Sequence, residues 1–156
     1  MKFAIPKPVQ AEHEELHATL VKATKAPGAV GETAREVARL LHPHFVREEE
    51  FALPPLALLS ELARGGVTPQ MAEVLPMTRR LKAELPGMLA EHKQIVGALD
   101  KLRAAAAAAK LPEYERFAEA LTLHAQTEET VLYPAAILIG EHVARTLETR
   151  ARAPER

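Results

Sequence analysis

The chain has 156 residues, of which 47% are hydrophobic and 26% are charged, values typical of one globular domain of about 100–200 residues. Twenty Lys and Arg against 21 Asp and Glu leave a net charge of -1, so there is no broad basic field for nucleic acid or an anionic membrane. The absence of cysteine excludes disulfides, thiolate zinc sites, iron–sulfur clusters and cysteine nucleophiles. Any metal must therefore be held by nitrogen and oxygen atoms.

The composition and the N-terminal residues predict a helical, cytoplasmic protein. Aromatic residues make up only 4% of the chain, whereas the helix formers Ala, Leu, Glu, Lys and Arg dominate it. Segment 1–6 has no long apolar run behind its charge, and no stretch approaches the roughly 20 apolar residues of a membrane span. We therefore expect an all-α fold in a single domain, 1–156, with neither a membrane nor a nucleic acid as partner.

Apolar residues at helical spacing predict four long helices. They are expected over about 9–25, 32–64, 69–109 and 112–150. Pro69 and Pro112 suit the first turns of the third and fourth helices, and Gly65 follows the second. Further prolines predict kinks, because each removes a backbone donor: Pro43, Pro54, Pro55, Pro76, Pro86 and Pro134. Long helices joined by short turns favour an up-down-up-down four-helix bundle with a helical core of about 9–149.

The sequence contains an internal duplication of a helix pair. Segment 12–16 resembles segment 91–95, and segment 44–49 resembles segment 124–129, at offsets of 79 and 80 residues. A proline follows each second segment at the same distance. The two halves of the bundle are therefore expected to repeat one arrangement.

Each copy of the repeat holds one histidine on its first helix and an H-x-x-x-E word on its second. Residues four apart share a helix face, so each His and Glu pair points the same way, into the apolar stripe of its helix. The set is His13, His44, Glu48, His92, His124 and Glu128. Burial of two carboxylates beside four imidazoles is costly without a cation. The alternative is a group of buried polar residues that satisfy one another.

Four imidazoles and two carboxylates favour borderline metals over Ca or Mg, which prefer oxygen ligands. Six ligands are too many for one four-coordinate zinc. Two metals bridged by Glu48 and Glu128 would keep coordination positions open for a small ligand. This is the arrangement expected of a di-iron centre.

The pattern H…HxxxE…H…HxxxE, with its EH, HxxxEE and LYP words, resembles the hemerythrin-like (HHE cation-binding) proteins from about Val9 to His142. The resemblance implies a carboxylate-bridged site for two non-haem Fe ions that binds O2 or related molecules, with the six residues above as ligands. Oxygen carriers of this family have a longer spacing to an Asp on the fourth helix and an HxxxH on the third. This chain has HxxxE on the fourth, and its HxxxH lies on the first helix, so His17 is either a fifth imidazole ligand or a histidine on the flank of the stripe.

Three functions follow as hypotheses. The first is a protein that binds or senses O2, NO or peroxide at the di-iron centre. The second is a di-iron enzyme that reduces peroxide or NO, or oxidises or handles iron. The third is a structural bundle whose histidines and glutamates bind zinc or nothing.

Residues beside the ligands receive simpler interpretations. We interpret Glu12, Glu49, Glu91 and Glu129 as solvated charges, with contact to the ligands as the alternative. Tyr133 is interpreted as a packing residue that is also near enough to hydrogen-bond at the site. The apolar stretch 51–59 is expected either to form a homodimer contact or to cap the core.

Overall fold

The structure is a computed structural model that describes residues 3–152, so positions 1–2 and 153–156 of the expected domain lie outside it. Its α-helices are α1 (Lys7–Thr24), α2 (Gly28–Arg47), α3 (Leu59–Leu62), α4 (Leu75–Ala108), α5 (Pro112–Thr127) and α6 (Tyr133–Arg152). Two π-helical turns, η1 (Glu48–Ala52) and η4 (Glu128–Leu132), and two 3₁₀ segments, η2 (Pro54–Leu58) and η3 (Pro69–Val74), complete the described part. No strand occurs within residues 3–152.

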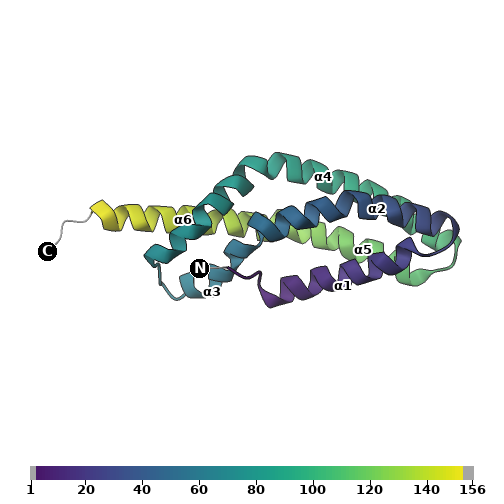
Figure 1. Cartoon of the computed structure of the whole chain (residues 1–156), viewed down its shortest axis with the longest axis horizontal. Helices are drawn as coiled ribbons and strands as arrows, with labels where there is room; N and C mark the ends of the chain where they lie inside the picture. Colours follow the sequence, from purple (N-terminus) through teal and green to yellow (C-terminus); the bar gives the residue numbers. More distant parts are fainter. Residues whose placement is uncertain (1–2, 153–156) are drawn as a thin grey trace.

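Four helical rods form the bundle, and they alternate in direction along the chain (Figure 1). The first is α1, the second α2 with η1, the third α4, and the fourth runs without a break through α5, η4 and α6. Helix α1 packs against α2 and α5, and α4 packs against the same two helices, so the rods close into a ring. The predicted all-α four-helix bundle is confirmed.

The second rod departs from the prediction that it continues to Arg64. Helix α2 ends at Arg47, and the chain then passes through η1, η2 and the short α3. Pro54 and Pro55 cause the change, because neither carries the backbone N–H that an α-helix requires there. The third rod likewise begins with a 3₁₀ turn from Pro69 before α4 starts at Leu75.

Both π-helical turns begin at the glutamate of an H-x-x-x-E word. The backbone N–H of Leu53 donates to the carbonyl of Glu48 at 2.9 Å, and that of Tyr133 donates to the carbonyl of Glu128. Each wide turn lies immediately before Pro54 or Pro134, where a regular helical hydrogen bond is impossible. The duplication is thus visible in the backbone, at equivalent positions of the second and fourth rods.

The apolar core is divided into two clusters, with the predicted ligands between them. One cluster lies towards the α1–α2 turn and includes Leu20, Val37, Leu99 and Leu121. The other includes most of stretch 51–58, together with Leu81 and Ile139. The stretch therefore caps the core, while Leu59 is exposed. Homodimer formation stays a prediction.

Within residues 3–152, none of the helices is both long enough and apolar enough to cross a membrane.

Candidate metal centre

Six of the seven predicted ligands meet at one level of the bundle. Each rod supplies one histidine, and the first residue of each π turn supplies a glutamate: His13, His44, His92, His124, Glu48 and Glu128. None of these six is more than 3% exposed. The H-x-x-x-E spacing places each glutamate one turn beyond its histidine, with Nε2–O distances of 3.1 Å for His44 and Glu48 and 2.9 Å for His124 and Glu128.

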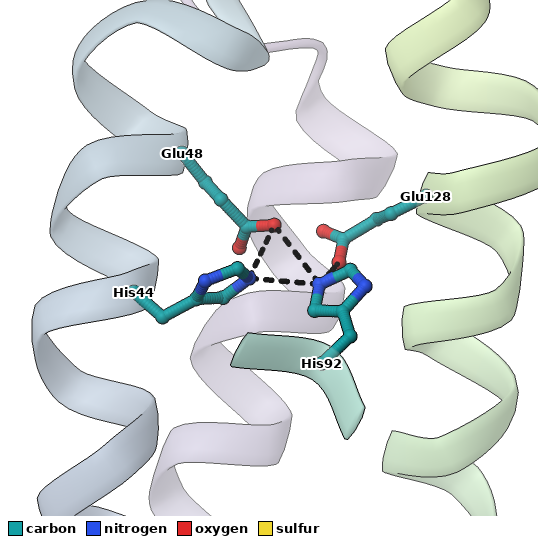
Figure 2. Close-up of side chains that lie close together, drawn as sticks. All are labelled: His44, Glu48, His92 and Glu128. Atoms are coloured by element: carbon teal, nitrogen blue, oxygen red, sulfur yellow. Dashed lines mark hydrogen bonds and ion pairs between the residues drawn. The ribbon is translucent and has the colours of Figure 1, made fainter. Parts of the chain in front are cut away.

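The six side chains divide into two groups, each built around a pair of imidazoles. Nε2 of His44 lies 2.8 Å from Nε2 of His92, and Nε2 of His13 lies 3.0 Å from Nε2 of His124. Glu128 has an oxygen near both pairs. Figure 2 shows the first group, with the carboxylates of Glu48 and Glu128 pointing towards each other on one side of its two imidazoles.

Each histidine also has a carboxylate partner on its outer nitrogen. Nδ1 lies within hydrogen-bonding distance of a glutamate oxygen in four pairs: His13 with Glu49 (3.3 Å), His44 with Glu91 (2.6 Å), His92 with Glu129 (3.0 Å) and His124 with Glu12 (3.2 Å). In the pairs of His13, His44 and His92, which form hydrogen bonds, the carboxylate only accepts, so Nδ1–H is the donor and Nε2 faces inward. His124 and Glu12 form an ion pair. We call these four residues the outer glutamates.

The interpretation of the outer glutamates as solvated charges is wrong, because each contacts a histidine of the cluster. Each neighbours a ligand in sequence and is rotated by about 100° from it. In a closed ring of rods this direction leads to the histidine of an adjacent rod rather than to bulk water. The repeated EH and HxxxEE words carried the signal, because they duplicate the outer glutamates along with the ligands.

The interior of the cluster fits a cation. Glu48 Oε2 is buried and has no hydrogen-bond partner, which is costly for a carboxylate oxygen. Four Nε2 lone pairs converge on the same space, and repulsion among them requires protons or a metal ion. Two nitrogens bound to one metal at about 2.1 Å and at right angles lie about 3.0 Å apart. The observed separations of 2.8 and 3.0 Å agree with this spacing.

A family model matches residues 7–136, under the description hemerythrin HHE cation binding domain. The chain belongs to this family. No curated protein and no solved structure gives a significant match. The matched range contains the four clustered histidines, Glu48 and Glu128, and the four outer glutamates of this hemerythrin domain. The buried cluster is therefore the place where this member of a cation-binding family could hold metal.

Tyr133, interpreted from the sequence as a packing residue within hydrogen-bonding reach of the site, is a part of the hemerythrin site in the structure. The side chain is fully buried, its hydroxyl donates to Glu48 Oε1, and its ring stacks on His92 with centroids 5.7 Å apart. The hydroxyl also lies 3.4 Å from Nε2 of His44 and 3.3 Å from that of His92. Burial and the nearby Glu48 carboxylate raise the pKa of Tyr133, so the phenol is protonated when no cation is bound.

The π turn explains the orientation of Tyr133. Tyr133 is five positions after Glu128, and in a regular α-helix the two side chains would point about 140° apart. In a π-helical turn the hydrogen bonds join residues five apart, so the two side chains return to the same face. Tyr133 therefore both hydrogen-bonds at the site and packs in the apolar cluster that contains Leu81 and Ile139.

His17 is not brought to the cluster. It is exposed, and it lines a surface groove between α1 and α2 that also contains His42. One turn along α1 displaces it by about 6 Å along the axis and about 40° around it from His13. That rotation carries it away from Leu16 and Leu20, which mark the buried face.

Without metal, the clustered histidines and glutamates of this hemerythrin site favour charged imidazolium–carboxylate pairs. Burial disfavours protonation of His92, but its hydrogen bonds to Glu128 and Glu48 outweigh burial and raise its pKa to about 10. The pKa values of the other three histidines are raised for the same reason. Burial disfavours ionisation of Glu128, yet hydrogen bonds from three histidines hold its pKa well below the usual range.

These shifts predict the pH dependence of metal-free stability. A raised histidine pKa stabilises the fold below pH 6.5, and the effect is lost as the pH rises towards about 10. A lowered Glu128 pKa stabilises the fold above pH 4.5 and is lost on acidification. We expect urea denaturation with a chelator present to show greater stability at pH 6 than at pH 9. Equal or greater stability at pH 9 would contradict the proposed ion pairs.

Proposed function

We propose that this protein holds two non-haem iron ions in a carboxylate-bridged centre and uses it to bind or sense O2 or a related small molecule such as NO or peroxide. The proposed ligands are His13, His44, Glu48, His92, His124 and Glu128. The observation that carries the proposal is the division of these residues into two groups that share Glu128. Mixed nitrogen and oxygen donors favour iron and similar metals over Mg and Ca.

The surrounding residues give this centre its working environment. The outer glutamates fix each imidazole with Nε2 facing inward, and they raise the basicity of that nitrogen. The apolar clusters on either side exclude water from the interior. Two iron ions bound there would supply open coordination positions and the ferrous and ferric states for chemistry with a small ligand.

Two surface grooves support access by small molecules. A groove of about 250 Å³ between α1 and α2 is lined by His13 and Phe45, among others. A second, of about 230 Å³ between α2 and α4, is lined by His44 and Glu91. Each reaches the outer edge of a proposed ligand, so a diatomic molecule has only a side-chain layer to cross.

An enzyme that reduces peroxide or NO, or that oxidises iron, is the second candidate function. Tyr133 favours it, because its buried O–H lies against Glu48 and two ligand imidazoles, where a proton is needed in oxygen reduction. Sustained consumption of peroxide by the iron-loaded protein, over many turnovers with a reductant, would favour the enzyme over the binding protein.

The first test is an anaerobic titration of metal-free protein with Fe(II), followed by admission of O2. We expect saturation at two irons per chain and the growth of charge-transfer absorption in the near-ultraviolet and visible regions after O2. Zn(II)-loaded protein is the control, because zinc has no redox chemistry. Saturation at one iron or none, with a featureless spectrum, would contradict the di-iron proposal and favour zinc or a network of protons.

A further inference from the structure

The two halves of the centre are related by the duplication, but they are not equal. The phenol subsite is defined here by Nε2 of His44, Nε2 of His92 and the hydroxyl of Tyr133. The open subsite is defined by Nε2 of His13, Nε2 of His124 and Glu48 Oε2, which has no hydrogen-bond partner. Both share the carboxylate of Glu128, and Glu48 Oε2 lies 3.8 Å from Nε2 of His13.

The first difference between the two subsites is a hydroxyl group, which is present at the phenol subsite and absent from the equivalent position of the repeat. In the first copy of the repeat, the residue that corresponds to Tyr133 is Leu53, which is completely buried in the apolar cluster that contains Leu81 and Ile139. At the open subsite the aromatic neighbour is Phe45, stacked on His13 at 4.1 Å between centroids. The position corresponding to Phe45 is Ala125. Of the two subsites, the phenol subsite thus has the hydroxyl of Tyr133, whereas the open subsite has the apolar ring of Phe45.

The outer glutamates differ in the same direction. At the phenol subsite they lie 2.6 and 3.0 Å from Nδ1 and are 33% and 36% exposed. At the open subsite they lie 3.3 and 3.2 Å from Nδ1 and are 50% and 53% exposed. Both contacts at the phenol subsite are hydrogen bonds, whereas His124 and Glu12 form only an ion pair. Shorter contacts in a less hydrated setting hold the imidazoles more firmly and make Nε2 a better ligand atom.

Arg47 adds a third difference. Its guanidinium donates to Glu91 Oε1 and lies 3.6 Å from Glu84, so Glu91 is held between an arginine and His44. The guanidinium charge is compensated by these two carboxylates. The corresponding residue in the other half is Thr127, whose hydroxyl donates to the carbonyl of Leu123 in its own helix. Glu12 therefore receives no equivalent support from that position.

We propose that the two subsites fill in order, a first divalent cation entering the phenol subsite and a second, more weakly held, entering the open subsite. The proposal rests on the two-metal function above and assigns a separate role to each half of the centre. The protein then has a defined one-metal state. Glu91, Arg47 and Tyr133 are the positioning residues that distinguish the first subsite from the second.

The duplication supplies matched variants, because Glu91 and Glu12 are equivalent outer glutamates. Metal-free protein is titrated anaerobically with Co(II), followed by calorimetry and visible absorption. We expect two steps in the wild type. Glu91→Gln should weaken the first step by about 10–100-fold, and Glu12→Gln should weaken the second by a similar factor, as is usual for partners of ligating histidines. Arg39→Gln, on an exposed pair of the same helix as His44, is the control and should change neither step.

A second readout locates the first cation. With one equivalent of Co(II), the shifted proton NMR signals should include the exchangeable Nδ1–H protons of His44 and His92. The His44 signal should be altered by Glu91→Gln and unaltered by Glu12→Gln. One-equivalent signals from His13 and His124, or equal effects of both variants on both steps, would overturn the ordered filling while two-metal binding stands. Wild-type saturation below two cations would overturn the ordered filling together with the di-iron proposal.

Discussion

Replacement of Glu128 by glutamine will abolish binding of at least one of the two metal ions. Glu128 belongs to both ligand groups, and its oxygens lie 2.9 Å from His124, 3.4 Å from His13 and 3.4 Å from His92. A neutral amide of the same shape keeps one oxygen but loses the charge and the second donor atom that a bridge needs. We expect saturation to fall from two Fe(II) to at most one. Any remaining site should be weaker by more than about 100-fold, beyond the usual cost of losing an outer partner.

Glu129→Gln is the control for that variant. Glu129 follows Glu128 in the sequence, but its carboxylate lies on the outer nitrogen of His92, at 3.0 Å from Nδ1. This variant should still bind two metal ions, with the affinity of one reduced. Anaerobic titration with metal analysis checks both proteins. Two ions of unchanged affinity in Glu128→Gln would show that the bridging role is wrong.

The fold and the six converging residues were predictable because local periodicity and duplication carry them. Helical spacing gave the rods, and the H-x-x-x-E words placed Glu48 and Glu128 on the same faces as their histidines. The offsets of 79 and 80 residues then required both halves to contribute alike. None of this depends on how the rods rotate against one another.

The surroundings of the cluster were not predictable in the same way. The contact of Glu91 with His44 depends on the rotation of α4 against α2, which a single helical wheel does not contain. Tyr133 depends on a π turn, and standard helical geometry turns it away from Glu128. The end of the second rod after η1 depends on the joint effect of Pro54 and Pro55, since the single prolines Pro43, Pro86 and Pro134 lie in rods that continue. A proline in the sequence therefore does not by itself tell whether a helix is kinked there or ends there.

Removal of metal should lower the melting temperature by a large amount. A cation that binds only the folded chain stabilises it by about 4 kcal/mol per site when its free concentration is 1,000 times Kd. For a domain of this size that corresponds to about 8–16 °C for each site. The buried Glu48 Oε2 adds a structural reason, because it has no hydrogen-bond partner and a cation would compensate its charge. Thermal melts with Fe(II) or with a chelator, both anaerobic, measure the difference.

The double variant His44→Ala with His124→Ala makes the thermal experiment specific. It removes one imidazole from each ligand pair, so its melting temperature should be the same with metal and with chelator, whatever its absolute stability. A wild-type melting temperature that is unchanged by metal would argue against a buried site linked to folding. Because the double variant is compared with itself, any cavity left by the missing rings affects both melts equally. The shift therefore reports the cation at the cluster rather than the packing of the bundle.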